Sequence, residues 1–399
     1  MRQLLQCGGA SGHLMHLHDD PGLSFAELKD VIRTAAEGRL ERVTEKLDGM
    51  NLVFTWDGEL RVARSGGDLR GGGLDAEALA EKFKDRGSVA EAFNGAFRVL
   101  HAALEALPPE ERRRIFGGGS LWYSVEVIYA KNPNVINYDG NWIVFHDSPV
   151  FHAQGDGRIV RSSDAPGARL LGRWIDRMQR AITVRSWQVR GAAVVRMKKL
   201  SDGRFADAAI EAIEEAQNEA GVDDSATVGD YVLALVSQRA EMLDLPAATA
   251  AAVAARVAGS PGAPKLPDIK KTVDQAAYRR IAGFVQAGPE LVRSAVAPLE
   301  LAIHGFAVEV LRGVHSTLVG NPSAEVQRLR AAVARAIKAS EGSPGSATLE
   351  RQVRKLGPLD NISSSMEGIV FIYKGNAYKF TGSFAPMNQI LGLLRYGRR

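Results

Sequence analysis

A lysine, two acidic residues, a glycine and an asparagine lie close together in residues 44–51, TEKLDGMN, at the entrance to the strand-like run LVFTW. A lysine amine is a nucleophile only when deprotonated, and with a pKa of about 10.4 only on the order of one molecule in a few thousand is neutral at pH 7. Desolvation or a neighbouring cation can favour the neutral amine, and Gly49 would let a ligand approach the backbone closely. The pattern makes Lys46 a candidate nucleophile, with Asp48 and Asn51 placed to orient it or a ligand.

Chance is the competing explanation for this short pattern. Lys-x-Asp-Gly should arise in roughly one chain of this length in ten, so a surface turn is an open alternative. Further motifs in a fixed order make a chance match less probable. Further candidates follow in order along the chain: Arg64 in RVARSGG, Glu126 in WYSVEVIY, Phe145 in IVFHD, Glu367 and Gly368 in MEGIVF, and Lys379 in AYKFTG.

These segments, led by EKLDG, resemble the ordered motifs of the covalent nucleotidyltransferases, the superfamily of polynucleotide ligases and mRNA capping enzymes. In that superfamily a lysine attacks the α-phosphate of a nucleotide and forms a lysyl-nucleotide. The resemblance implies that Lys46 is the nucleophile, that Glu126 and Glu367 hold the ribose or a divalent metal, and that Lys379 binds the α-phosphate. It also implies nucleotide-binding roles for Glu45 (beside the base, through its backbone), Asp48, Gly49, Asn51, Arg64 (at the ribose) and Phe145 (stacked on the base).

The implied function is ATP-dependent polynucleotide ligation. AMP would pass from ATP to Lys46 and then to a 5′-phosphate end, and a 3′-hydroxyl would displace it, with Mg²⁺ or Mn²⁺ at each phosphoryl step. The partners would be RNA or DNA ends; LDGMN after the lysine is closer to RNA ligases, and the chain resembles bacteriophage RNA-ligase-like proteins. Two alternatives stay open: nucleotide transfer in capping or to a protein or small molecule, and a non-catalytic nucleic-acid-binding descendant.

The chain also departs from the superfamily pattern. Where the fifth motif usually has a second lysine, Thr381 or Ala377 stands, and Lys374 on the same hairpin is a possible substitute. Members of the superfamily often carry a C-terminal OB-type domain after the fifth motif, and here the tail SFAPMNQILGLLRYGRR stands at that place. About 240 residues separate Glu126 from Glu367, so a helical insertion in that gap is the candidate polynucleotide clamp.

Local patterns predict the elements that must position these residues. Ser24 and Glu27 form a capping-box pattern at the start of a helix, and Asp57-Gly58 predicts a hairpin between two strands. A helix is expected over about 76–106, followed by strands in SLWYSVEVIYAK and GNWIVFHDSPVFHA. The last strands, in GIVFIYKGNAYKFTG, are joined by a turn at residues 374–376.

Residues 165–350 read as mainly helical, with one strand-like passage, RSWQVRGAAVVRMKKL. Trp187 in that passage is expected in the core rather than as a base-stacking platform. Asn321 and Pro322 read as the cap and first position of a later helix. We therefore predict an α+β fold, an antiparallel-sheet nucleotidyltransferase (ATP-grasp-like ligase adenylation) core interrupted by an α-helical insertion. The expected parts are residues 1–160, the insertion at 161–350, and the rest of the core with the C-terminal tail at 351–399.

Composition places few limits on this prediction. The 399 residues are 45% hydrophobic and 24% charged, as in ordinary soluble proteins, and the net charge is only +4 although the pI is about 9.1. The single cysteine, Cys7, rules out an internal disulfide, and no signal peptide or run of 18 apolar residues is apparent. The expected location is cytoplasmic, in the host cell if the protein is phage-encoded, with no membrane partner and a monomeric state.

Three weaker patterns leave their alternatives open. His13, His16 and His18 could bind a metal, or could lie in a loop packed on the core near the nucleotide. The glycine-rich GASGH and SGGDLRGGG could cradle phosphates or could simply be turns. The arginines in RWIDRMQRAITVRSWQVR and RLRAAVARAIKAS could track a phosphate backbone or could be solvated helix faces.

Overall fold

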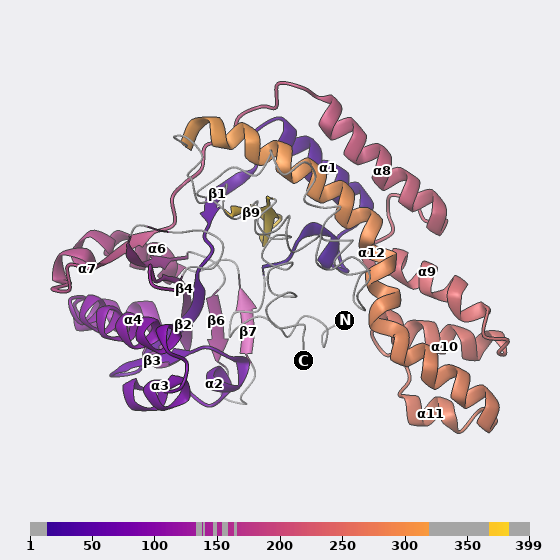
Figure 1. Cartoon of the computed structure of the whole chain (residues 1–399), viewed down its shortest axis with the longest axis horizontal. Coiled ribbons are helices and arrows are strands. Elements are labelled where there is room, and N and C mark those ends of the chain that lie inside the picture. Colours follow the sequence, from indigo (N-terminus) through magenta and orange to yellow (C-terminus); the bar gives the residue numbers. More distant parts are fainter. Residues whose placement is uncertain are drawn as a thin grey trace. The chain divides into compact units, whose positions relative to one another are not determined.

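The computed structural model describes residues 14–132, 138, 140–146, 150–153, 159–162, 166–318 and 367–382. They form two compact units, coloured along the sequence in Figure 1. The unit that we call helical contains Met15–Leu40 and Met197–Val314, and the sheet unit contains Glu41–Arg196 and the last two strands. The boundary expected at residue 160 thus falls inside the sheet unit, because the segment after it supplies a further strand of the sheet. Residues 321–322 lie outside the described residues.

The sheet unit carries the strands that bear the predicted site. Its strands are β1 (Glu41–Lys46), β2 (Met50–Trp56), β3 (Leu60–Ala63), β4 (Leu121–Ile128), β5 (Asn141–Phe145), β6 (Val150–Ala153), β7 (Ile159–Ser162), β8 (Trp187–Gly191), β9 (Gly368–Tyr373) and β10 (Asn376–Thr381). Its helices are α2 (Gly66–Arg70), α3 (Ala76–Phe83), α4 (Ser88–Glu105), α5 (Pro109–Phe116), the 3₁₀ turn η2 (Gly117–Gly119), α6 (Pro166–Arg173) and α7 (Ile175–Ala181).

These strands form two sheets. The larger has seven strands, in the order β3-β2-β4-β5-β8, with β6 pairing β4 and β7. All its pairs are antiparallel except β5 with β8, which are parallel. The smaller sheet is antiparallel, in the order β1-β9-β10. The fold is therefore α+β, with antiparallel and mixed sheets.

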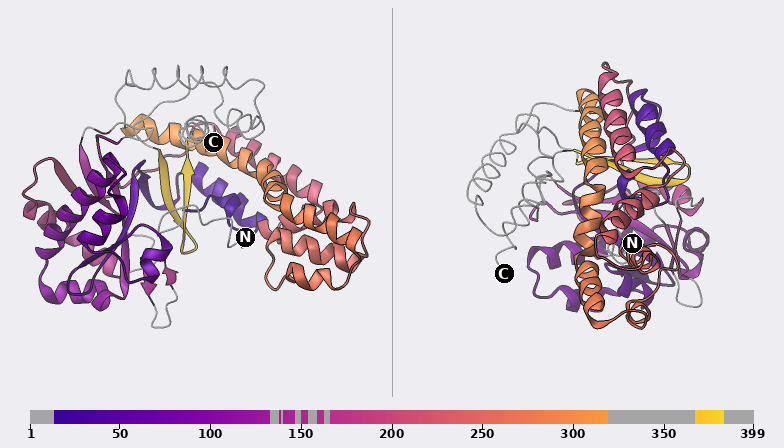
Figure 2. Two further views of the ribbon diagram at one scale, coloured as in Figure 1. Left: turned by 60° about the horizontal axis from the view of Figure 1, so that its bottom comes forward. Right: turned by 90° about the vertical axis from the view of Figure 1, so that its right-hand side faces the viewer.

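The two predicted turns are both confirmed. Trp56 of β2 pairs with Leu60 of β3, and Gly58 between them has φ of 118°, a value that L-residues rarely adopt. At the other end of the chain β9 and β10 lie side by side (Figure 2, yellow). Their turn at Lys374 and Gly375 again uses positive φ, 46° and 79°.

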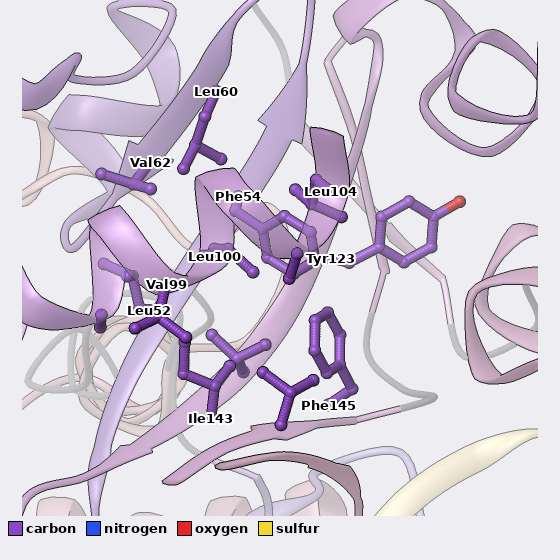
Figure 3. Packing of buried hydrophobic residues seen from close by; sticks show 14 of the residues in the cluster. Leu52, Phe54, Leu60, Val62, Val99, Leu100, Leu104, Tyr123, Ile143 and Phe145 are labelled. Carbon is purple, nitrogen blue, oxygen red and sulfur yellow. The ribbon is translucent and has the colours of Figure 1, made fainter. Parts of the chain in front are cut away.

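The core of the sheet unit lies on one face of the larger sheet. Side chains alternate along a strand, so Leu52 and Phe54 of β2 share a face with Val125 and Phe145 on neighbouring strands. This face packs against α4, and Figure 3 shows the rings and aliphatic side chains that meet there. Trp187 on β8 is 6% exposed and belongs to this core, as expected.

The helical unit contains η1 (Leu17–Asp19), α1 (Phe25–Ala36), α8 (Arg204–Ala220), α9 (Val228–Glu241), α10 (Ala247–Ala258), α11 (Leu266–Lys270) and α12 (Gln275–Leu318). The predicted capping box at α1 is confirmed: the Glu27 amide donates to Ser24 Oγ at 3.2 Å, and the Ser24 amide donates to Glu27 Oε2 at 2.9 Å. Buried Lys29 pairs with Asp224 at 2.5 Å and with Glu214 at 3.2 Å, which joins α1 to the loop between α8 and α9 and to α8.

The long helix α12 is the element whose length and composition bear on membrane insertion. Among the described residues, α12 alone is long and apolar enough to cross a bilayer by length and composition. A core helix of a soluble protein passes the same test, and α12 buries Leu299, Ile303 and Phe306. It is weak evidence for a span, and the structure is consistent with a location away from the membrane.

Candidate active site

The strand register determines which predicted residues share a face of the larger sheet. Asn51 of β2 pairs with Glu126 of β4, Glu126 with Val144 of β5, and Val144 with Arg190 of β8. Residues directly opposite one another on paired strands point to the same side. Asn51, Glu126 and Arg190 therefore form one row, on the face opposite to the core.

The smaller sheet places two of the predicted lysines together. Lys46 pairs with Gly368, and Gly368 with Thr381. Lys379 lies two residues before Thr381, so it faces the same side of the sheet as Lys46. Glu367 directly precedes β9, opposite the end of β1. Segments separated by 321 positions are thus brought together around the candidate nucleophile.

Lys46 and Glu367 form an ion pair, in which the Lys46 ammonium donates to Glu367 Oε2. Both side chains are largely buried, with exposed fractions of 20% and 15%. Burial alone would lower the pKa of Lys46, but the charges of Glu367, Glu126 and Asp48 outweigh it and raise the pKa. The expectation that the surroundings favour a neutral amine is therefore wrong for this arrangement, because three carboxylates hold the proton on Lys46.

The carboxyl of Glu367 is affected in the opposite way by the same burial. Burial raises its pKa, and Asp48 adds to this effect, while Lys46 and the more distant Lys379 oppose it. Lys379 is thus close enough for its charge to act on Glu367. The Lys46–Glu367 pair is thus a charged centre, and the charge of Lys379 acts on it as well.

Glu126 is held from two sides. The Gly49 amide donates to its Oε1 at 3.0 Å, and His146 Nε2 lies 3.5 Å from its Oε2. A Cβ at Gly49 would lie 2.7 Å from Glu126 Cγ and 2.8 Å from the Val127 carbonyl oxygen. Glycine is required here because the backbone passes against the strand that carries Glu126.

No model of a known protein family matches this chain. No curated protein and no solved structure matches it either.

Two further residues of TEKLDGMN, Asp48 and Asn51, have hydrogen-bond partners on other segments. The Asp48 amide donates to the Tyr138 hydroxyl at 2.9 Å, and Asn51 Nδ2 donates to Ser124 Oγ at 2.6 Å. Burial raises the pKa of Tyr138, so its hydroxyl keeps its proton. Asp48 and Asn51 are therefore oriented by residues of other segments.

Glu45 points to the other side of β1. Its carboxylate accepts from Arg190 Nη1 and, at 2.9 Å, from the Ala193 amide. The Glu45 amide donates to the Ala193 carbonyl at 2.9 Å. Arg190 also stacks on Trp142, with 4.8 Å from Cζ to the ring centroid. Glu45 thus joins the end of β1 to β8 and to the segment after it, through both its backbone and its side chain.

Arg64 lies at the end of β3, near Glu126. Burial lowers the pKa of its guanidinium, while the charges of Glu126 and Asp68 oppose that shift. The amides of Arg64 and Ser65 donate to the Asp68 carboxylate at 3.0 Å and 2.8 Å. In SGGDLRGGG the Ser65 amide is therefore bonded within the capping box of α2, and the amides of residues 71–73 donate to backbone carbonyls of the same segment. The segment GASGH lies outside the described residues.

Phe145 does not join the site row. Its ring is 5% exposed, lies 5.5 Å from the Phe54 ring between centroids, and belongs to the core in Figure 3. It pairs with Val125, on the face opposite to Glu126. The role of stacking on a base is thus not supported for Phe145, because a shift of one residue moves a side chain to the other face. Its neighbours Val144 and His146 face the site instead.

Lys374 is also misplaced for its suggested role. It lies in the turn at the far end of the hairpin from Glu367, roughly 20 Å along the strand at about 3.3 Å per residue. It is exposed, and its ammonium lies over the Tyr373 ring at 5.5 Å. It cannot replace a second lysine beside Lys379, since Ala377 and Thr381 occupy those positions.

The histidines belong elsewhere. His16 and His18 lie in the helical unit and stack with 5.1 Å between ring centroids, and His18 Nε2 lies 3.7 Å from Asp19 and 3.9 Å from Glu300. His13 lies outside the described residues. Among the residues that the structure describes, no group of three or more His, Cys, Asp and Glu is arranged to hold a metal ion.

Three site residues were not predicted from the sequence: Tyr138, His146 and Arg190. Each contacts a predicted residue, namely Asp48, Glu126 and Glu45. Alternation along the strand could have indicated His146, because it follows Phe145 and faces the other side. Nothing local in the sequence marks Tyr138 or Arg190.

The backbone of β10 explains why a glycine, Gly368, follows Glu367. This close approach can be tested by substitution. A Cβ there would lie 2.1 Å from the Phe380 carbonyl oxygen and 3.0 Å from Thr381 Cα, both backbone atoms. We expect Gly368→Ala to destabilise the protein by about 1–3 kcal/mol in urea unfolding, because β10 must move away. The matched control is Gly283→Ala in α12, where a Cβ meets nothing within 4 Å. Equal stability of the two variants would contradict this packing.

Proposed function

We propose that this protein is an ATP-dependent polynucleotide ligase that carries AMP on Lys46, with RNA ends preferred over DNA ends. The observation that supports the proposal most directly is the meeting of Lys46 with Glu367, with the charge of Glu126 acting on the same ammonium. These residues come from three distant segments whose order resembles the nucleotidyltransferase motifs. A surface turn would not gather buried carboxylates around one lysine.

In the proposed first step the Lys46 amine attacks the α-phosphorus of ATP. A P–N bond forms, the bond from the α-phosphorus to the bridging oxygen breaks, and pyrophosphate leaves with its electron pair. The Lys46 ammonium must first give up a proton, either to water or to the Glu367 carboxylate that accepts its hydrogen bond. Lys379, on the same face as Lys46, is placed to offset negative charge at the α-phosphate.

Mg²⁺ or Mn²⁺ is proposed to enter with the nucleotide. Glu126 and Glu367 have the oxygen ligands that Mg²⁺ prefers, but they are engaged with Gly49, His146 and Lys46. With no metal-binding group among the described residues, phosphate oxygens would have to supply most of the ligands. When bound, the ion would neutralise phosphate charge.

The later steps follow from the same chemistry. A 5′-phosphate oxygen attacks the phosphorus of the lysyl-AMP, which breaks the P–N bond, and a 3′-hydroxyl then displaces AMP to form the phosphodiester. The proposal implies a monomeric, cytoplasmic protein, in a host cell if it is phage-encoded. Its macromolecular partners are nucleic acid ends with a 5′-phosphate and a 3′-hydroxyl.

The test is incubation of the full chain with ATP and Mg²⁺, followed by intact mass and peptide mapping. We expect added mass of one AMP on the peptide that contains Lys46. GTP and NAD serve as alternative donors, and absence of any adduct with all three would refute the proposal. Joining assays on nicked RNA, nicked DNA and single-stranded RNA then identify the substrate. An adduct without joining of any strand would favour transfer to another acceptor.

A further inference from the structure

Positive charge is concentrated in one segment of the sheet unit. Residues 166–196 hold seven arginines, no lysine and a single acid, Asp176. The whole chain has 50 Lys and Arg against 46 Asp and Glu, so subtracting seven and one leaves 43 against 45 elsewhere. The net positive charge of the protein therefore comes from this segment.

Four of these arginines lie on one side of a helical stretch. Arg169, Arg173, Arg177 and Arg180 are spaced by four, four and three residues, which on a continuous α-helix corresponds to an arc of about 80° at 3.6 residues per turn. Trp174, between α6 and α7, has φ of −97° and ψ of −3°, close to helical values. All four arginines are exposed. We call them the arginine stripe.

The opposite side of this stretch is anchored. Ala168, Leu171 and Met178 are buried in the core cluster. Gln179 Oε1 accepts from the Val189 amide of β8 at 2.5 Å, and α7 also packs against α4, near which it lies in Figure 1. The stripe is thus presented by a helix whose orientation is fixed, and β8 carries Arg190 into the candidate site.

The stripe differs from the other charged helix faces of this protein. Elsewhere exposed basic residues are often matched by an acid three positions away, as in Lys84 with Glu81, Arg293 with Glu290 and Arg312 with Glu309. Among the described residues, no carboxylate forms an ion pair with Arg173, Arg177 or Arg180. Arg177 stacks instead on Trp174, at 5.2 Å from Cζ to the ring centroid. The stripe therefore concentrates four arginines beside a single acid, Asp176, on one stretch of helix.

We propose that the arginine stripe binds the phosphate backbone of the nucleic acid on which the enzyme acts, which rests on the proposed function. A guanidinium group can donate two parallel hydrogen bonds to two oxygens of one phosphate, which the ammonium group of lysine cannot do with the same geometry. The stripe is about 16 Å long at 1.5 Å per residue, and a duplex carries one phosphate charge per roughly 1.7 Å of axis. Contacts of this kind position the nucleic acid without reading its sequence.

The test compares two triple variants of the full chain. R173Q/R177Q/R180Q removes three charges of the stripe and keeps residues that favour a helix. K84Q/R86Q/R279Q removes three exposed charges elsewhere and is the matched control. Binding is measured by fluorescence anisotropy with labelled duplex RNA containing one 5′-phosphorylated nick, over a series of salt concentrations.

We expect the stripe variant to bind at least about tenfold more weakly than the control and to lose about two to three from the slope of log affinity against log salt. Equal affinity and slope for the two variants would overturn the proposal. Binding of the unchanged protein to vesicles of equal parts phosphatidylserine and phosphatidylcholine, but not to RNA, would also overturn it and indicate a membrane surface.

The outcome is separable from that of the proposed function. The stripe variant should form the AMP adduct at the same rate as the unchanged protein, because the stripe does not include the residues around Lys46. Anisotropy requires no catalysis. If the unchanged protein forms no adduct, the ligase proposal fails, while RNA binding still decides whether the stripe holds a phosphate backbone.

Discussion

Lys46→Arg is expected to abolish the AMP adduct while leaving the fold intact. A guanidinium keeps its proton at all accessible pH and cannot attack phosphorus, yet it can still pair with the Glu367 carboxylate. We expect the rate of adduct formation to fall by at least about three orders of magnitude, as for loss of a group that makes the covalent bond. Intact mass after timed incubation with ATP and Mg²⁺ measures it.

The matched control for this variant is Lys82→Arg. Lys82 also forms an ion pair with a carboxylate, that of Asp68, but lies outside the candidate site. It should form the adduct at the normal rate. An adduct on the Lys46→Arg protein would mean that the nucleophile is another residue, and a changed circular dichroism spectrum would show whether either replacement disturbs the fold.

Adduct formation is also expected to rise about 100-fold between pH 7 and pH 9. The pKa of Lys46 is raised above its ordinary value of 10.5, so the amine is protonated throughout this range. Its neutral fraction then grows tenfold with each unit of pH, and kcat/KM for ATP reports this free-protein ionisation. A plateau below pH 9 would contradict a raised pKa.

Glu367→Gln tests the cause of that shift without relying on catalysis. Among the groups that raise the pKa of Lys46, the charge of Glu367 is the largest, so its removal should lower the pKa. We expect Lys46 to react with acetic anhydride at pH 8 at least about tenfold faster in this variant, as read by peptide mapping. Glu91→Gln, which removes a carboxylate that pairs with Lys131, is the charge-matched control and should leave the rate unchanged.

Several features of this protein could be predicted because they depend on neighbours in the sequence. The Ser24 capping box and the turns at Gly58 and Gly375 follow from side chains or φ values within a few residues. The burial of Trp187 followed from its place in a strand-like apolar run. The α+β class followed from strand-like segments at both ends of the chain.

Which of the predicted residues reach the candidate site depends on the register of the strands, and not only on neighbours in the sequence. Glu126 and Phe145 lie on paired strands, but one faces Lys46 and the other faces the core. Which face is buried is decided by where α4 packs, and the spacing within IVFHD contains no information about that. The same register brings His146, the residue after Phe145, to Glu126.

By itself, then, the sequence determined the local elements and the order of the residues that could carry a nucleotide. Only the tertiary structure decided the charge state of Lys46, because its carboxylate partner lies 321 positions away. It also decided that Glu45 holds Arg190 and that the arginines of α6 and α7 face solvent together. Electrostatic effects depend on distance in space and on burial, and both arise only when remote segments pair and pack.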